Sequence, residues 1–367
     1  MMNSTTGKVI VFLITAVALM ALPLVLQATG SNSWVRIVDI ALLYVLLALG
    51  LNIVVGYAGL LDLGFVAFFA VGAYLYGLLA SPHLAENFAW IAASFPDGLH
   101  VSFWLVMVIA AVTAGVTGLI LGAPVLKLRG DYLAIVTLGF GEIVRIFMLN
   151  LDRPINLTNG PKGISQIDPV TVFGHSMGQR LTLSVGDWTY TLESVTLYYY
   201  LILFFVLMAI VVCNRMQDSR IGRAWMAVRE DEIAAKAMGL NTRNLKLAAF
   251  GTSATLGGLS GVLFASFMRG VYPESFILME SVMIVAMVVL GGLGHIPGVI
   301  LGALVLAGLP ELLRHVAHPL TALTDGRLGP EILRQLLIAL AMIIIMLLRP
   351  KGLWPSPEHG KSLTKGA

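Results

Sequence analysis

Long apolar runs constrain this chain more than any other feature of its sequence. Hydrophobic residues make up 58% of its 367 residues and charged residues only 12%, whereas a soluble domain has about 25% charged residues. Because a bilayer-spanning helix needs ~17–25 apolar residues, the sequence predicts an all-α polytopic membrane protein with about ten transmembrane helices, in a range of eight to eleven. The predicted spans are 9–28, 35–55, 61–80, 102–125, 132–150, 195–213, 247–268, 276–293, 297–313 and 332–348.

The first apolar run, 9–28, follows Lys8 and is longer than the ~7–15-residue core of a signal peptide. Gln27-Ala28-Thr29 is a poor match to a small-x-small cleavage site. We therefore expect this run to be retained as the first span.

The distribution of lysine and arginine predicts the orientation. If the N-terminus is cytoplasmic, the cytoplasmic segments carry fourteen of these residues and the outer segments eight, as the positive-inside rule requires. The same rule accounts for the net charge of +3, which therefore does not indicate nucleic-acid binding. The prediction is a multi-pass protein of the cytoplasmic (inner) membrane with both termini cytoplasmic. It consists of one transmembrane domain over 1–350, an extracytoplasmic loop over 151–194, a cytoplasmic loop over 214–246 and a cytoplasmic tail over 351–367.

The 214–246 loop is strongly charged, with seven basic and four acidic residues between two apolar runs. Its middle, Arg223–Met238, contains no glycine or proline and is rich in helix-forming residues. Gly239 and Asn241 follow, and these residue types end helices. The sequence predicts a short helix, held between two spans, that contacts a partner outside the bilayer.

The 151–194 loop contains an alternating stretch, LTLSVGDWTYTLESV, which predicts a small hairpin across Gly186-Asp187. We expect this loop to cap the outer face, where a soluble partner could dock. The loop also contains Gly174-His175-Ser176-Met177-Gly178, which matches the GxSxG motif of hydrolases. That motif needs a strand, a helix and a surrounding α/β sheet, and the loop is too short to hold them, so a hydrolase built on Ser176 is disfavoured.

Nucleotide and metal chemistry are not predicted for this chain. The P-loop pattern GxxxxGK[ST] is absent, so any ATP hydrolysis belongs to a separate subunit. Cys213 is the only cysteine, which excludes an intramolecular disulfide and any paired-cysteine metal site. We expect no bound cofactor and no enzymatic activity in the chain itself.

Few charges interrupt the apolar runs: Asp62, Glu142, Arg145 and Glu280. Each costs ~2.5–3.5 kcal/mol at mid-bilayer, so such residues face protein or water and often mark a transport path. Glu142 and Arg145 share a helix face, and a structural ion pair and a place on the path are equally favoured. For Asp62 a helix-capping role is favoured over a place on the path. The absence of a chain of buried acids disfavours a proton-driven carrier.

Glycines spaced four apart occur within the runs, at Gly118 and Gly122 and at Gly257 and Gly261. This spacing lets helices pack closely in lipid. The stretch GGLGHIPG over 291–298 predicts either close packing or a broken connection near the path.

Several segments together resemble the branched-chain amino acid ABC importer permeases, and in particular the larger of the two permease subunits. The resemblance covers roughly residues 35–350 in order. Its motifs are GYAGLLDLGFVAFFAVGAY (56–74), LKLRGDYLAIVTLGFGEIVRI (126–146), RPINLTNGPKGI (153–164), SRIGRAWMAVREDEIAAKAMGLN (219–241) and VVLGGLGHIPGVILGA (288–303).

The resemblance implies import of leucine, isoleucine or valine by a complex embedded in membrane lipid. Its implied partners are a second, smaller permease, two ATP-binding subunits that hold ATP and magnesium, and an extracytoplasmic substrate-binding protein. The 222–239 segment resembles the family's coupling loop, in which E-A-A-x3-G is matched with Ile233 inserted and without the usual downstream Ile-x-Leu-Pro. The implied ATPase-coupling residues are Gly222, Arg223, Trp225, Arg229, Glu230, Asp231, Glu232, Ala234, Ala235 and Gly239.

Two alternatives stay open at this point. Related permeases for urea and short amides share the same outline, and a secondary carrier is the less favoured alternative. No residue is predicted as a substrate ligand.

Overall fold

The computed structural model describes residues 17–27, 32–125, 128, 130–172, 174–185 and 188–323, with isolated positions between 336 and 354. Of the predicted span at 332–348 only isolated positions are described, and of the tail at 351–367 only 352–354. Residues 9–16 of the span predicted at 9–28 lie outside the described residues.

Five described helices are long and apolar enough to cross a membrane, which confirms a helical membrane protein with several spans. Four shorter apolar helices accompany them, so the count of ten spans stays a prediction. The long helices are α2 (Asn32–Asn52) with its π-helical continuation η1 (Ile53–Tyr57), α6 (Phe103–Val125), α7 (Asp131–Asn150), α8 (Ser194–Asp218) and α11 (Thr242–Met268). The shorter ones are Val17–Gln27, α3 (Val66–Leu79), α12 (Leu278–Gly291) and the start of α13 (Ile296–Leu323).

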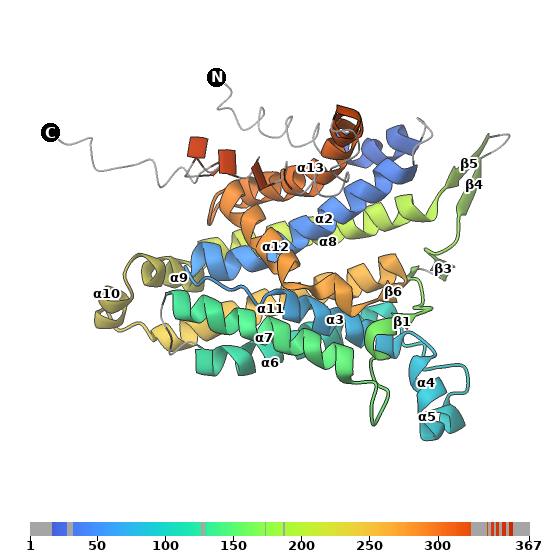
Figure 1. Ribbon diagram of the computed structural model, residues 1–367, viewed down its shortest axis with the longest axis horizontal. Helices are drawn as coiled ribbons and strands as arrows, with labels where there is room; N and C mark the ends of the chain where they lie inside the picture. Colours follow the sequence, from blue (N-terminus) through green and yellow to red (C-terminus); the bar gives the residue numbers. More distant parts are fainter. Residues whose placement is uncertain are drawn as a thin grey trace.

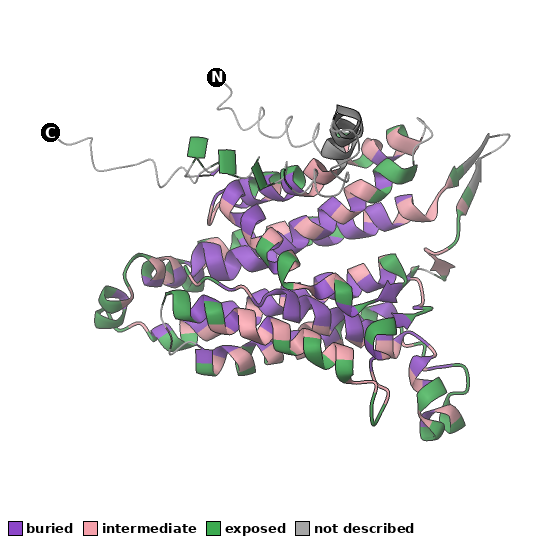
Figure 2. Ribbon diagram, viewed as in Figure 1, coloured by how far each residue is buried: buried purple, intermediate pink, exposed green. Residues whose placement is uncertain are grey.

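The helices form two groups (Figure 1). Helices α2, α8 and α13 pack together, α3, α6 and α11 pack together with α7 alongside, and α12 runs between the groups. Buried residues concentrate where the helices face one another (Figure 2). The exposed faces of α6 and α7 remain apolar, with side chains such as Val108, Ile120 and Phe147 about half exposed or more, as expected for surfaces that meet lipid or another membrane subunit.

Glycine brings α11 into direct backbone contact with its neighbours. A Cβ atom on Gly72 of α3 would lie 2.0 Å from the carbonyl oxygen of Gly258 on α11. A Cβ atom on Gly118 of α6 would lie 2.5 Å from the Cβ of Ala254. The packing role predicted for the spaced glycines is thus confirmed for Gly118.

The predicted span over 61–80 begins later than expected. Helix α3 starts at Val66, and residues 58–65 before it are not helical although half of them are buried. The chain passes close to α7 here, since a Cβ on Gly64 would lie 2.2 Å from the carbonyl oxygen of Thr137. A second irregular stretch precedes α12 and contains the short strand β6 (Gly270–Val271) and the single 3₁₀ turn η3 (Pro273–Phe276). Irregular backbone inside a membrane bundle survives only where protein covers it or where it lines a cavity.

The two polar regions of the chain lie at opposite ends of the bundle (Figure 1). The charged loop forms two short helices at one end, and short helices and hairpins occupy the other. The hairpin predicted across Gly186-Asp187 is confirmed, because β4 pairs with β5 and Val185 faces Trp188. Ser176 lies in a two-residue strand and not at the strand-to-helix turn that a hydrolase needs. The elements at this end are α4 (His83–Asn87), α5 (Ala89–Ser94), η2 (Gly160–Lys162), β1 (Ile164–Ser165), β2 (Thr171–Val172), β3 (His175–Ser176), β4 (Leu181–Val185), β5 (Trp188–Leu192) and β6.

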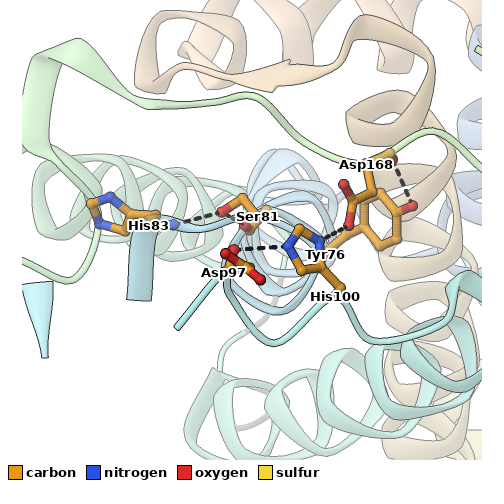
Figure 3. A network of polar contacts seen from close by, with 7 residues as sticks. Tyr76, Ser81, His83, Asp97, His100 and Asp168 are labelled. Carbon is orange, nitrogen blue, oxygen red and sulfur yellow. Dashed lines mark hydrogen bonds and ion pairs between the residues drawn. The ribbon is translucent and has the colours of Figure 1, made fainter. Parts of the chain in front are cut away.

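A polar network fastens the loop after α5 to the segment after β1 (Figure 3). The His100 Nδ1 atom lies 2.5 Å from an Asp168 carboxylate oxygen, and its Nε2 atom lies 2.8 Å from the Asp97 carbonyl oxygen. The Tyr76 hydroxyl donates to the Asp168 carbonyl at 2.9 Å. The hydrogen bond to the Asp168 carboxylate, helped by the Asp97 carbonyl, raises the pKa of His100 above its ordinary value.

Candidate functional site

The charged loop folds into two helices, α9 (Arg220–Glu230) and α10 (Glu232–Ala237), so the prediction of one continuous helix over Arg223–Met238 is wrong. The break lies at Asp231, whose backbone is extended and whose Oδ1 accepts from the amides of Ile233 and Ala234 at 2.8 and 3.1 Å. Asp231 therefore acts as the N-cap of a new helix. The predicted stop is confirmed, since Gly239 adopts a φ of 87° after α10.

One face of α9 is anchored in the bundle. Trp225 is 1% exposed and its indole nitrogen donates to the Leu245 carbonyl of α11 at 2.7 Å. Gly222 lies against the end of α8, where a Cβ would sit 2.1 Å from the Met216 carbonyl oxygen. Helix α9 is thus tied to both spans that flank it.

Arg229 extends this anchoring to a distant part of the chain. Its Nη1 atom donates to the Gly56 carbonyl at 2.5 Å, inside the π-helical segment η1. Its stem lies over Gly59, and its guanidinium lies beside Gly294 in the connection from α12 to α13. The Gly294 amide in turn donates to Asn52 Oδ1 at 3.0 Å. π-Helical turns occur frequently at functional sites, and this one receives the contact from α9.

Glu232 and Lys246 form an ion pair that closes the same region. The Lys246 Nζ atom lies 2.7 Å from Glu232 Oε2, and the two side chains are 7% and 34% exposed. Lys246 belongs to α11, so this pair fixes the start of α10 to a membrane helix. A cavity of about 340 Å³ adjoins the pair and reaches the 58–61 segment and the start of α7.

The ten predicted coupling residues divide into two groups. Gly222, Trp225 and Ala235 are buried and Arg229 and Glu232 partly buried, so these five hold the loop in place. Arg223, Glu230, Asp231, Ala234 and Gly239 are exposed.

The structure adds two apolar side chains that the sequence reasoning did not assign to the site. Ile233, within α10, is 72% exposed, and Met238, the residue that ends α10, is 85% exposed. Both could have been found in the sequence, because apolar residues on a short, exposed, charged helix indicate a contact surface.

The predicted capping role of Asp62 is wrong for α3. The N-cap of α3 is Phe65, without a side-chain cap. Asp62 is 1% exposed, and its Oδ1 accepts from the Gly64 amide at 2.9 Å, which shapes the turn before α3. Its other carboxylate oxygen has no hydrogen-bond partner among the described residues.

The predicted pairing of Glu142 and Arg145 is confirmed. The Arg145 Nε atom donates to both carboxylate oxygens of Glu142, at 3.0 and 3.1 Å, on the same face of α7. The side chains are 37% and 22% exposed. The pair is not one of the contacts described above that hold α9 and α10 against the bundle.

Apolar spans, buried interruptions in those spans, and an anchored charged segment at one end together define a transport permease of the membrane. The family model for branched-chain amino acid transport system permease components matches residues 33–347. The chain therefore belongs to this family and is a multi-pass inner-membrane protein.

Curated relatives agree with this assignment. The chain is 39% identical over 361 residues to the high-affinity branched-chain amino acid transport system permease protein LivM of Escherichia coli, covering 96% of this chain and 77% of the relative. A probable LivM of Methanocaldococcus jannaschii is 26% identical over 85% of this chain and 90% of its own length. The LivH permease of Salmonella typhimurium is 26% identical over 87% of this chain and 93% of its own length. No solved structure matches the chain.

Proposed function

We propose that this permease component imports leucine, isoleucine and valine across the cytoplasmic membrane as one half of a heterodimer with a smaller permease. The family match and the similarity to both LivM and LivH proteins support a paired permease for these substrates. In this proposal the chain has about ten spans, with both termini in the cytoplasm.

Two ATP-binding subunits supply the energy, and hydrolysis of magnesium-bound ATP takes place on them. The observation that carries this step is the anchored pair of helices α9 and α10, which combines an exposed surface with buried attachments to four parts of the bundle. The exposed residues dock on an ATP-binding subunit, and Trp225, Arg229 and Glu232 transmit its movement to the membrane helices.

An extracytoplasmic binding protein delivers the substrate at the opposite end, onto the hairpins and short helices of the 151–194 segment and its neighbours. Asp62 and the Glu142–Arg145 pair either border the path between the two ends or stabilise the helices that form it.

The test is uptake by the complete importer reconstituted in liposomes with its binding protein. We expect uptake of radiolabelled leucine that requires both ATP and the binding protein, and no uptake of radiolabelled urea. Uptake of urea instead of leucine would reassign the substrate, and leucine uptake without ATP would overturn the assignment to an ATP-driven importer.

A further inference from the structure

A cavity of about 300 Å³ lies where η3 and α12 pass between α2, α3 and α11. This volume is at the lower end of the ~300–1,000 Å³ typical of small-molecule sites. It corresponds to roughly ten water molecules at ~30 Å³ each, which is room for one amino acid the size of leucine. The cavity is distinct from the coupling site, because its walls come from the middle of α2 and the start of α12.

Resting on the function proposed above, we propose that this cavity binds the amino acid in transit, with Glu280 receiving its α-ammonium group. The apolar walls, which include Leu43, Phe69 and Phe264, then surround the branched side chain. An apolar lining with a few placed polar groups is the usual construction of such a site.

Glu280 is suited to receive an ammonium group because its charge lacks a counter-ion. The Tyr44 hydroxyl donates to Glu280 Oε2 at 2.8 Å, and this neutral group orients the carboxylate without neutralising it. In the described ranges no lysine, arginine or histidine nitrogen lies within 4.0 Å of the carboxylate. A carboxylate within a membrane helix is costly and by default marks a functional site. A cationic ligand in the adjoining cavity supplies the missing charge.

The same geometry predicts selectivity. Urea and the 2-keto acid derived from leucine lack an ammonium group, so they leave the Glu280 charge unmatched while fitting the cavity by size. Glu274 also lines the cavity, so an amino acid with an acidic side chain places a second negative charge beside two carboxylates. The site therefore favours zwitterions over acidic amino acids and over analogues without an ammonium group.

A cysteine-protection experiment tests occupancy directly. Cys213, the only native cysteine, is buried, and Ser275 lies on the cavity wall. In the assembled importer, we expect leucine to slow the reaction of an uncharged maleimide with Ser275→Cys severalfold, and the keto acid and urea to leave it unchanged. The control Ser165→Cys, exposed on β1, should react at one rate throughout. Absence of leucine protection, or equal protection by the keto acid, would overturn the proposal.

A second variant tests the carboxylate. We expect Glu280→Gln to lower leucine uptake at least about tenfold, the change that 1.4 kcal/mol produces, in an importer that still assembles. Normal uptake by Glu280→Gln would refute this site and leave the proposed function standing, whereas a wild-type importer that takes up no branched-chain amino acid would refute the function itself. If Glu280→Gln fails to assemble, the protection experiment decides.

Discussion

Removing the carboxylate of Glu232 tests how the charged loop is held. The Glu232→Gln variant keeps the shape of the side chain but leaves the Lys246 ammonium group, 7% exposed, without its ion-pair partner at 2.7 Å. We expect a less stable loop and weaker coupling, because the uncompensated charge is the buried member of the pair.

The stability that Glu232→Gln loses lies between two limits. Breaking a fully buried pair costs ~3–5 kcal/mol because it strands a charge, whereas surface pairs are worth ~0–1 kcal/mol. Glu232 is 34% exposed, so water already screens one partner. We therefore expect a loss of about 2 kcal/mol in the free energy that holds α10 against α11.

The assay compares Glu232→Gln, Lys246→Met and the double variant by thermal melting of the purified complex and by leucine-stimulated ATPase activity. The double variant buries no unmatched charge, and replacing a buried pair by apolar groups is often neutral. We expect it to recover most of the stability and the stimulated activity lost in Glu232→Gln. If Glu232→Gln melts like the wild type yet loses ATPase stimulation, and the double variant does too, Glu232 contacts the partner and the reasoning fails.

Three further predictions concern the same two ends of the molecule. Replacing Arg229 by Met removes a charged hydrogen bond worth ~1.5–3 kcal/mol and should lower ATP-driven uptake about tenfold without releasing the ATP-binding subunits; retained uptake would show that this contact is not used. A Trp at exposed Ala234 should block recruitment of the ATP-binding subunits in a co-purification assay at an unchanged melting temperature, whereas a Trp at buried Ala235 should also lower that temperature. Because the pKa of His100 is raised in the fold, its bond to Asp168 stabilises the 95–101 loop below about pH 6.5 and is lost as the pH rises through the raised value; the hydrogen-exchange protection factors of residues 95–101, which correct for the intrinsic pH dependence of exchange, should fall from pH 6 to pH 9, and those of an Asp168→Asn variant should not change.

The sequence predicted the features that depend on local pattern. Apolar runs gave the long helices, because length and hydropathy are enough to indicate a span. The hairpin at Gly186-Asp187 and the helix stop at Gly239 follow from turn and capping preferences of single residues.

The features that depend on contacts between distant residues were not predictable. Helix-forming residues on both sides of Asp231 favour one helix, whereas α9 ends beside Arg229, whose side chain is fixed to a carbonyl 173 residues away. The segment before α3 has the composition of a span, yet Gly64 lies against α7 at Thr137. Glu280 was recognisable as a charge in an apolar run, but Tyr44, the residue that orients it, lies 236 positions earlier.

The proposed coupling site and the cavity are joined by two helical segments of matching length. Tyr44 and Gly56 are twelve residues apart along α2 and η1, and Glu280 and Gly292 are twelve apart along α12 and its end. At ~1.5 Å per residue both paths span about 18 Å, and both finish where α9 contacts the bundle, at Gly56 and at the connection that holds Gly294. A tilt of about 10° around that contact moves the cavity walls by roughly 3 Å. Such a displacement is large against a cavity of about 300 Å³, so in the proposed mechanism a small movement of α9 would change the room available to the amino acid.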